Sequence, residues 1–272
     1  MNRRKTAPPR GVLSTGTATA DPRRYAHARY HPSPDLEPFV EHYWSVRWDL
    51  DGIAPERAET LPHPSVHMIF EANAGSRIAG VTRGKFSRVL SGKGSVIAAK
   101  FKPGGFYPFL QMPVSTFTNR TLPLADVFAG ADAVTDTVHA APDDAARLTI
   151  IEDFLRGRAP QRDELAERVA TIVYAVAETR TILRVEDLVA RYGLNVRALQ
   201  RVFAKYVGVS PKWVIQRYRL HEAAEVLRGT HAVDQAALAL ALGYSDQAHF
   251  VRDFKAVVGL PPAAYARRAR ER

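Results

Sequence analysis

The first half of the chain alternates apolar and polar positions with a period of two, which is typical of β-strands. Residues 43–48 read Tyr-Trp-Ser-Val-Arg-Trp, so successive side chains would lie on opposite faces of a strand. Further apolar or β-branched runs, separated by glycines, occupy residues 65–71, 77–82, 86–90 and 95–101. Short strands joined by glycine turns predict an antiparallel sheet or a small barrel.

After Pro123 the apolar period changes to three and four residues, which is typical of helices. The clearest examples are Ala145–Arg156 and Gln161–Glu178, which are separated by the breaker-rich segment 157–160. A domain boundary is therefore expected near residues 156–180. We interpret the helix at 161–178 as the first helix of the C-terminal domain rather than as a linker.

Two segments near the C-terminus repeat the same residues about 51 positions apart. In both, a leucine precedes a glycine by five residues, and two large apolar residues four apart enclose an arginine. A further glycine and a proline follow five and eight residues after the last aromatic residue. The matched positions are Leu188, Gly193, Leu199, Arg201, Phe203, Gly208 and Pro211, and Leu238, Gly243, Phe250, Arg252, Phe254, Gly259 and Pro262.

Each copy has the pattern of a helix-turn-helix unit. Gly193 and Gly243 can adopt the left-handed conformation that closes a first helix. Asn195 in the first copy, and Ser245 or Asp246 in the second, can cap the helix that follows. That second helix would bury its apolar pair and expose the opposite face.

The exposed faces carry residues suited to the major groove of DNA. Arginine can bond guanine, glutamine can bond adenine, and lysine binds phosphates. We therefore predict DNA contacts from Arg197, Gln200, Arg201, Lys205, Gln247, His249, Arg252 and Lys255. Residues 188–221 contain seven Lys or Arg and no acid, which also favours a polyanion as partner.

The segment that joins the two copies, Trp213–Leu227, lacks glycine and proline and keeps helical spacing. A continuous helix here would fix the two recognition helices about one turn of DNA apart, roughly 10 base pairs.

The predicted fold class is α+β, with three parts. Residues 1–30 form a disordered basic tail, and residues 31–156 form a β-rich effector or dimerisation domain that ends in helices. Residues 161–272 form an all-α domain with two helix-turn-helix units.

The charge distribution fits this division. The chain has 272 residues and a net charge of +10. Residues 1–30 carry about +6 and residues 181–272 about +7, so the body between them carries about −3. A basic C-terminal domain attracts phosphate backbones. The chain has no cysteine, which excludes thiolate chemistry and, with no secretory signal or apolar membrane span in the sequence, predicts a cytoplasmic protein.

Residues from about 165 to 268 resemble the DNA-binding domain of the AraC/XylS family of bacterial regulators. The resemblance rests on the run from Gly243 to Lys255, on Gly259-Leu-Pro-Pro262, and on Leu199–Phe203 with Gly208-Val-Ser-Pro211. By position, the residues with which the family reads bases and phosphates fall on Arg197, Gln200, Arg201, Gln247, Ala248, His249 and Arg252. The resemblance also implies a β-rich effector or dimerisation domain in front.

The β-rich body offers two kinds of candidate site. His63 and His67, with Glu71 nearby, are residue types that metals use, but lone histidines more often lie buried, and we predict no metal site and no cofactor. Aromatic residues could line an apolar pocket for a small ligand or could simply form the core. The ligand-pocket hypothesis names Tyr43, Trp44, Trp48, His63, His67, Phe70, Phe101 and Phe106.

These observations favour a sequence-specific transcription regulator that binds double-stranded promoter DNA and responds to a small-molecule effector. RNA polymerase is a partner if the protein activates, a homodimer is compatible with the sequence, and no membrane partner is expected. The alternatives are a non-specific architectural DNA-binding protein and an enzyme fused to a DNA-binding module. The alkyl-transferring members of the resembled family use a cysteine, which this chain lacks, and no other catalytic motif is present, so we predict a protein that is not an enzyme.

Overall fold

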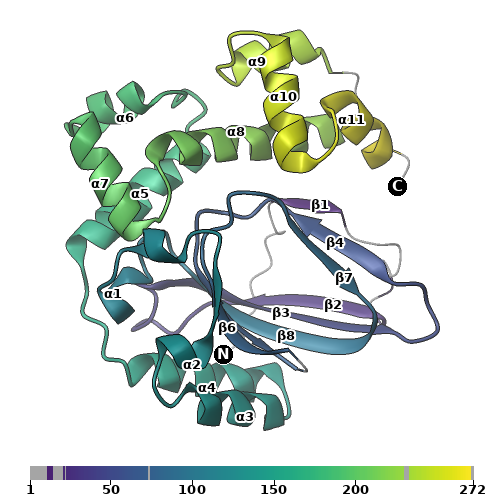
Figure 1. The fold of residues 1–272 in the computed structure, drawn as a ribbon, viewed down its shortest axis with the longest axis vertical. Coiled ribbons are helices and arrows are strands. Elements are labelled where there is room, and N and C mark those ends of the chain that lie inside the picture. Colours follow the sequence, from purple (N-terminus) through teal and green to yellow (C-terminus); the bar gives the residue numbers. More distant parts are fainter. Residues whose placement is uncertain (1–10, 15–20, 22, 73, 230–232, 271–272) are drawn as a thin grey trace.

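The computed structural model describes residues 11–14, 21, 23–72, 74–229 and 233–270. A β-rich domain with a few helices forms one end of the molecule, and an all-helical domain lies across the top of it (Figure 1). The fold is therefore α+β, as the change of period along the chain predicts. None of the helices in these ranges is long and apolar enough to cross a bilayer.

Antiparallel pairing builds a six-stranded sheet in the order β2-β3-β8-β5-β6-β9. Its longest strands, β3 and β8, pair along almost their whole length, from Val40 opposite Phe101 to Leu50 opposite Gly92. The strands are β2 (Tyr25–Tyr30), β3 (Val40–Leu50), β5 (His67–Glu71), β6 (Gly75–Ala79), β8 (Gly92–Phe101) and β9 (Thr121–Pro123). The predicted runs 65–71, 77–82 and 95–101 thus correspond to β5, β6 and β8, and the run 86–90 forms a strand of a second, smaller sheet.

A smaller sheet has the order β1-β4-β7, formed by Val12–Ser14, Glu56–Thr60 and Phe86–Leu90. An apolar cluster joins the two sheets: Trp48, Leu50 and Val96 come from the large sheet and Leu90 from the small one. The carboxylate of Glu71, buried in the large sheet, accepts hydrogen bonds from Arg77 of β6 and Arg88 of β7. The two sheets are therefore held together by apolar packing and by a buried ion cluster.

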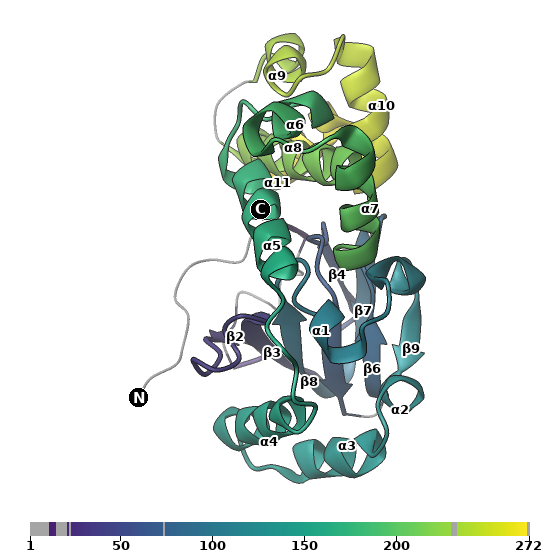
Figure 2. The same cartoon turned by 90° about the vertical axis from the view of Figure 1, so that its left-hand side faces the viewer.

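Short helices cover one end of the large sheet (Figure 2). The main core of the β-rich domain lies between Tyr43, Phe70 and Phe101 of the sheet and Leu148 and Ile151 of the helix α4. The helices are α1 (Tyr107–Leu110), a 3₁₀ turn η2 (Val114–Phe117), α2 (Leu124–Val127), α3 (Ala131–Ala140) and α4 (Asp144–Arg156).

The tail prediction is partly wrong. Tyr25–Tyr30 is an edge strand that pairs with β3 from Tyr25 opposite Trp48 to Tyr30 opposite Tyr43, and Val12–Ser14 pairs with β4. Both segments obtain their order from long-range pairing, which a composition-based prediction of disorder does not consider. The remainder of the predicted tail, residues 1–10, 15–20 and 22, lies outside the described residues.

The helical domain begins at α5 (Glu164–Glu178), whose first turn is capped by the carboxylate of Asp163. Val169 and Val173 of this helix share a core with Leu199, Phe203 and other residues of the first repeat. This packing is what we expect of the first helix of the C-terminal domain. The other helices are α6 (Val185–Tyr192), α7 (Val196–Tyr206), α8 (Pro211–Arg228), α9 (Gln235–Ala241), α10 (Gln247–Val258) and α11 (Pro262–Arg270).

The two domains pack closely on each other. Val81, next to β6, belongs to the apolar core of the first repeat, and Leu61, next to β4, belongs to that of the second. Arg217 of α8 is 2% exposed, and its guanidinium donates to the backbone carbonyls of Arg83 and Gly84. The β-rich domain therefore contacts both repeats and the helix between them.

Candidate nucleic-acid interface

The first repeat folds as a helix-turn-helix unit. Gly193 ends α6 with a φ of 64°, in the left-handed region where a glycine costs least. The side chain of Asn195 accepts a hydrogen bond from the Ala198 amide (2.8 Å) and so caps α7. Leu199 and Phe203 are fully buried one turn apart, which orients the opposite face of α7 toward solvent.

The second repeat follows the same plan. Gly243 has a φ of 81° at the end of the first helix, and the carboxylate of Asp246 caps α10 by accepting from the His249 amide (2.7 Å). Of the two candidate caps, the structure therefore selects Asp246. Phe250 and Phe254 are both fully buried, with ring centroids 5.6 Å apart.

Most predicted DNA-contacting side chains lie on the exposed faces of α7 and α10. Arg197, Gln200, Arg201, Gln247, Arg252 and Lys255 are exposed. Among the described residues, none of the four cations in this set forms an ion pair with a carboxylate. They are therefore available to an anionic partner. α7 and α10 lie on the same side of the molecule, on the right in Figure 2.

Two of the predicted residues have protein partners. His249 is half-buried, packs edge-on against the Tyr244 ring at 5.2 Å, and lies 3.6 Å from the carboxylate of Asp253. The ammonium of Lys205 lies 4.6 Å from the ring centroid of Tyr107, which belongs to the β-rich domain. A DNA backbone would have to share Lys205 with that ring.

The linker helix is confirmed and is slightly longer than predicted, running from Pro211 to Arg228. The acid-free stretch before Glu222 is not wholly directed at solvent, because Arg217 and Arg219 are buried. Arg219 donates to the Val176 carbonyl (2.7 Å), and burial lowers the pKa of Arg217 to about 10. These two arginines hold α8 against its neighbours, so their charge does not contribute to an exposed DNA-binding face.

The aromatic candidates for a ligand pocket separate into three places. Tyr43, Phe70, Phe101 and Phe106 are packed into the main core, and Trp48 lies between the two sheets. The indole of Trp44 donates to Nδ1 of His67 (3.1 Å), whereas the ring of His63 packs against that of His221 of α8, with centroids 4.6 Å apart and planes tilted by 35°. The first four residues are therefore part of one packed core, in which the rings of Phe101 and Phe106 meet with centroids 5.0 Å apart. The eight residues do not surround a single space.

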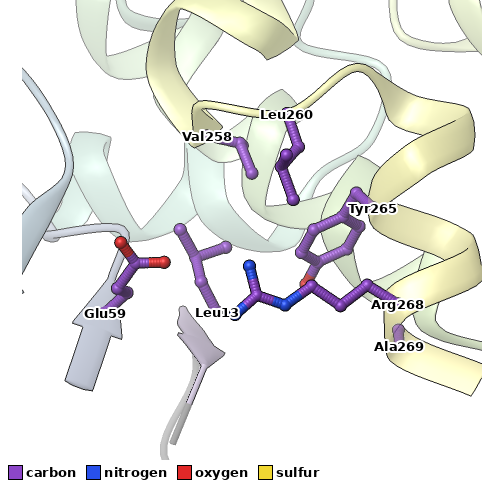
Figure 3. A pocket seen from close by; sticks show the side chains of 7 residues that line it. All are labelled: Leu13, Glu59, Val258, Leu260, Tyr265, Arg268 and Ala269. Carbon is purple, nitrogen blue, oxygen red and sulfur yellow. The ribbon is translucent and has the colours of Figure 1, made fainter. Parts of the chain in front are cut away.

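Two hollows occur elsewhere, and none of the eight residues lines either. A hollow of about 400 Å³ lies beside β6, β9, α2 and α3 and is lined by residues 74–77, 121, 123–125, 132 and 135. A smaller one lies between the domains, where Arg268 and Tyr265 of α11 approach Leu13 of β1 and Glu59 of β4 (Figure 3). The ligand-pocket residues thus remain a prediction from sequence.

The half-buried imidazole of His67 makes stability depend on pH. Burial, with the nearby charges of Lys100 and His42, lowers its pKa to about 3, an effect that Glu41 opposes. In the unfolded chain the His67 imidazole binds a proton near pH 6.5, whereas in the folded protein it stays neutral until the pH approaches 3. The stability that neutral His67 contributes is therefore complete above pH 6.5 and declines as the pH falls toward 3. We expect the free energy of unfolding, from urea titrations between pH 7 and pH 4.5, to fall less steeply in His67→Gln than in the wild type. Identical slopes would contradict the assignment.

The geometry defines a class of protein with two helix-turn-helix units joined by one continuous helix. The second helices of the two units carry exposed basic residues and lie on the same side of the molecule (Figure 2). Known proteins of similar sequence also contain such a domain. Residues 188–268 match a family described as a helix-turn-helix domain, and residues 28–123 match a domain of unknown function, DUF6597. Over 83 residues the chain is 35% identical to the HTH-type transcriptional activator AarP of Providencia stuartii. This match covers 30% of the chain and 61% of AarP.

The chain is also similar to solved structures. A probable AraC family transcriptional regulator from Rhodopseudomonas palustris CGA009 is 28% identical, with a TM-score of 0.33, over 36% of this chain and 93% of that one. ToxT from Vibrio cholerae O395 is 11% identical, with a TM-score of 0.37, over 90% of this chain and 97% of that one. Residues 188–268 of the C-terminal domain thus match a helix-turn-helix family, as the repeated motif indicates.

Proposed function

We propose that the protein is a sequence-specific DNA-binding transcription regulator. The observation that carries the proposal is the repeated recognition helix, in which Arg201 and Arg252 occupy equivalent exposed positions on α7 and α10. Arginine on a helix in the major groove can bond guanine with two hydrogen bonds, which gives sequence preference as well as affinity. Promoter DNA is the proposed target, and RNA polymerase is a partner if the regulator activates.

The β-rich domain is the proposed site of control by a small-molecule effector or by pairing with a second copy. Its packing against both repeats supports this role. Because the β-rich domain directly contacts α7, α8 and the second unit, a change in its conformation would be transmitted to them. A cytoplasmic location completes the proposal.

The first experiment measures fluorescence anisotropy with DNA from upstream of the protein's own gene and with scrambled DNA of equal length, at two salt concentrations. A preference for the upstream DNA that persists at the higher salt supports a sequence-specific regulator. Equal, salt-sensitive binding to both would direct the search to a random-sequence selection. Failure of that selection to enrich any sequence would establish an architectural protein instead.

Replacing either Arg201 or Arg252 by alanine is expected to weaken binding to the selected site by roughly 1–3 kcal/mol, because one base contact is lost. Both side chains are exposed, so circular dichroism should be unchanged. The matched control is Arg162→Ala, which removes an exposed arginine that pairs with Glu167 near the start of α5. An unfolded variant would disprove the assigned face, and a loss equal to that of the control would disprove the base contact.

A further inference from the structure

The β-rich domain contains a long stretch without acidic residues. Between Glu71 and Asp126 the 54 residues 72–125 include eight Lys or Arg and no Asp or Glu. The domain as a whole is not basic, so this stretch concentrates positive charge in β6, β7, β8, η2 and their loops. Surfaces that bind polyanions have this composition, and the position of the stretch relative to α7 is therefore informative.

The acid-free stretch lies directly beside the first recognition helix. Oγ1 of Thr118, which follows η2, donates to the Gly208 carbonyl just after α7 (2.6 Å). The ring of Tyr107 lies 4.5 Å from that of Tyr206, the last residue of α7. The acid-free stretch of the β-rich domain and that of the DNA-binding domain therefore meet at the C-terminal end of α7.

Two exposed arginines lie at this junction. Arg120 lies two residues after Thr118 in the sequence. Arg83 is held close to Arg120, because the Arg83 amide donates to the side chain of the neighbouring Asn119 (2.8 Å). No carboxylate in the described part of the chain pairs with either arginine, and one Nη of Arg120 donates to the Thr116 carbonyl. β9, which begins next to Arg120, lies on the same side of the molecule as α7 and α10 (Figure 2).

The dimensions of α7 bring DNA to this place. Its 11 residues make a helix about 16 Å long, at about 1.5 Å per residue. The major groove is only about 12 Å wide, which is less than the length of α7. When the N-terminal end of such a helix lies in the groove, its C-terminal end therefore reaches the phosphates. Base contacts from Arg197 at the start of α7 and Arg201 at its middle leave its C-terminal end, and the junction beside it, against the backbone.

We propose that Arg83 and Arg120 bind phosphates of the duplex that α7 reads, so that the β-rich domain forms part of the DNA-binding surface. The inference rests on the proposed function for the position of the duplex. It adds contacts from a domain outside the two helix-turn-helix units, and these contacts contribute affinity without sequence preference.

The test uses the full chain and measures the logarithm of the binding constant against the logarithm of salt concentration. Each phosphate contact contributes a slope of about 0.9, so Arg83→Ala and Arg120→Ala are each expected to reduce the slope by about that amount, and the double variant by about 1.8. The affinity should fall by the same factor on selected and scrambled DNA. Arg120→Lys should retain the wild-type slope, because lysine also binds phosphate as a point charge.

The control is Arg57→Ala, which removes an exposed arginine of β4 in the same domain. Slopes that equal the wild-type value in Arg83→Ala and Arg120→Ala, or that fall equally in Arg57→Ala, overturn the inference. These slopes can be read on any duplex. If the wild-type protein shows no preference for any DNA sequence, the proposed function is refuted. The salt slopes of the variants still decide whether the two arginines bind phosphates.

Discussion

Phe203→Ala is expected to lower the free energy of unfolding by about 3–5 kcal/mol and to weaken DNA binding with it. The Phe203 side chain is fully buried in a core that joins α5, α6, α7 and α8, and this core includes Val81 of the β-rich domain. Truncation of the Phe203 side chain leaves a cavity in the core whose packing sets the orientation of α7. DNA affinity should fall because α7 no longer holds its exposed residues in one position, although the substituted residue touches no DNA.

Urea denaturation followed by circular dichroism measures this effect. Val196→Ala, at the exposed N-terminal end of the same helix, serves as the control and should change stability by about 0.5 kcal/mol or less. Equal effects of the two substitutions would show that the Phe203 core does not determine the stability of the first unit.

Glu71→Ala is expected to destabilise the β-rich domain by about 3–5 kcal/mol. Glu71 is 2% exposed, and its carboxylate receives hydrogen bonds from Arg77 (2.6 Å) and Arg88 (2.6 Å). Burial already lowers the pKa of both arginines, so removal of the carboxylate leaves two partly desolvated cations without their anion. The small sheet should separate from the large one, because Arg88 belongs to β7.

Thermal and urea denaturation test the substitution against Asp49→Ala. The carboxylate of Asp49 is 45% exposed and pairs with Lys93, and exposed pairs of this kind contribute about 0–1 kcal/mol. A loss in Glu71→Ala no larger than in Asp49→Ala would mean that Glu71 does not join the sheets.

The helical domain could be predicted from sequence because its signals are local. A closing glycine, a capping Asn or Asp and two apolar residues one turn apart specify each unit within about twenty positions, and the repeat shows the pattern twice. The strands of the large sheet were predictable where apolar runs are bounded by glycines. β4, Glu56–Thr60, was not, because three of its five residues are charged and only its pairing with β1 and β7 makes it a strand.

Contacts between the domains were beyond prediction from sequence. Arg217 and Arg219 belong to an acid-free stretch of exposed-looking cations, and only the docking of the β-rich domain and α5 makes them buried hydrogen-bond donors. The aromatic residues of the body indicated burial correctly, but no local pattern separates rings that fill a core from rings that line a pocket. Lys205 shows the same limit, since its aromatic partner Tyr107 lies about a hundred positions away.

The continuous helix α8 restricts which changes of chain length the protein can accept. One inserted residue would advance the second unit by about 1.5 Å and turn it by about 100° relative to the first. No shift along the duplex offsets such a change, because successive base pairs are about 3.4 Å apart and turn by only about 35°. The insertion would also rotate Arg217 or Arg219 away from its carbonyl partners. The 18-residue length of α8 therefore acts as a fixed gauge for the separation of the two half-sites.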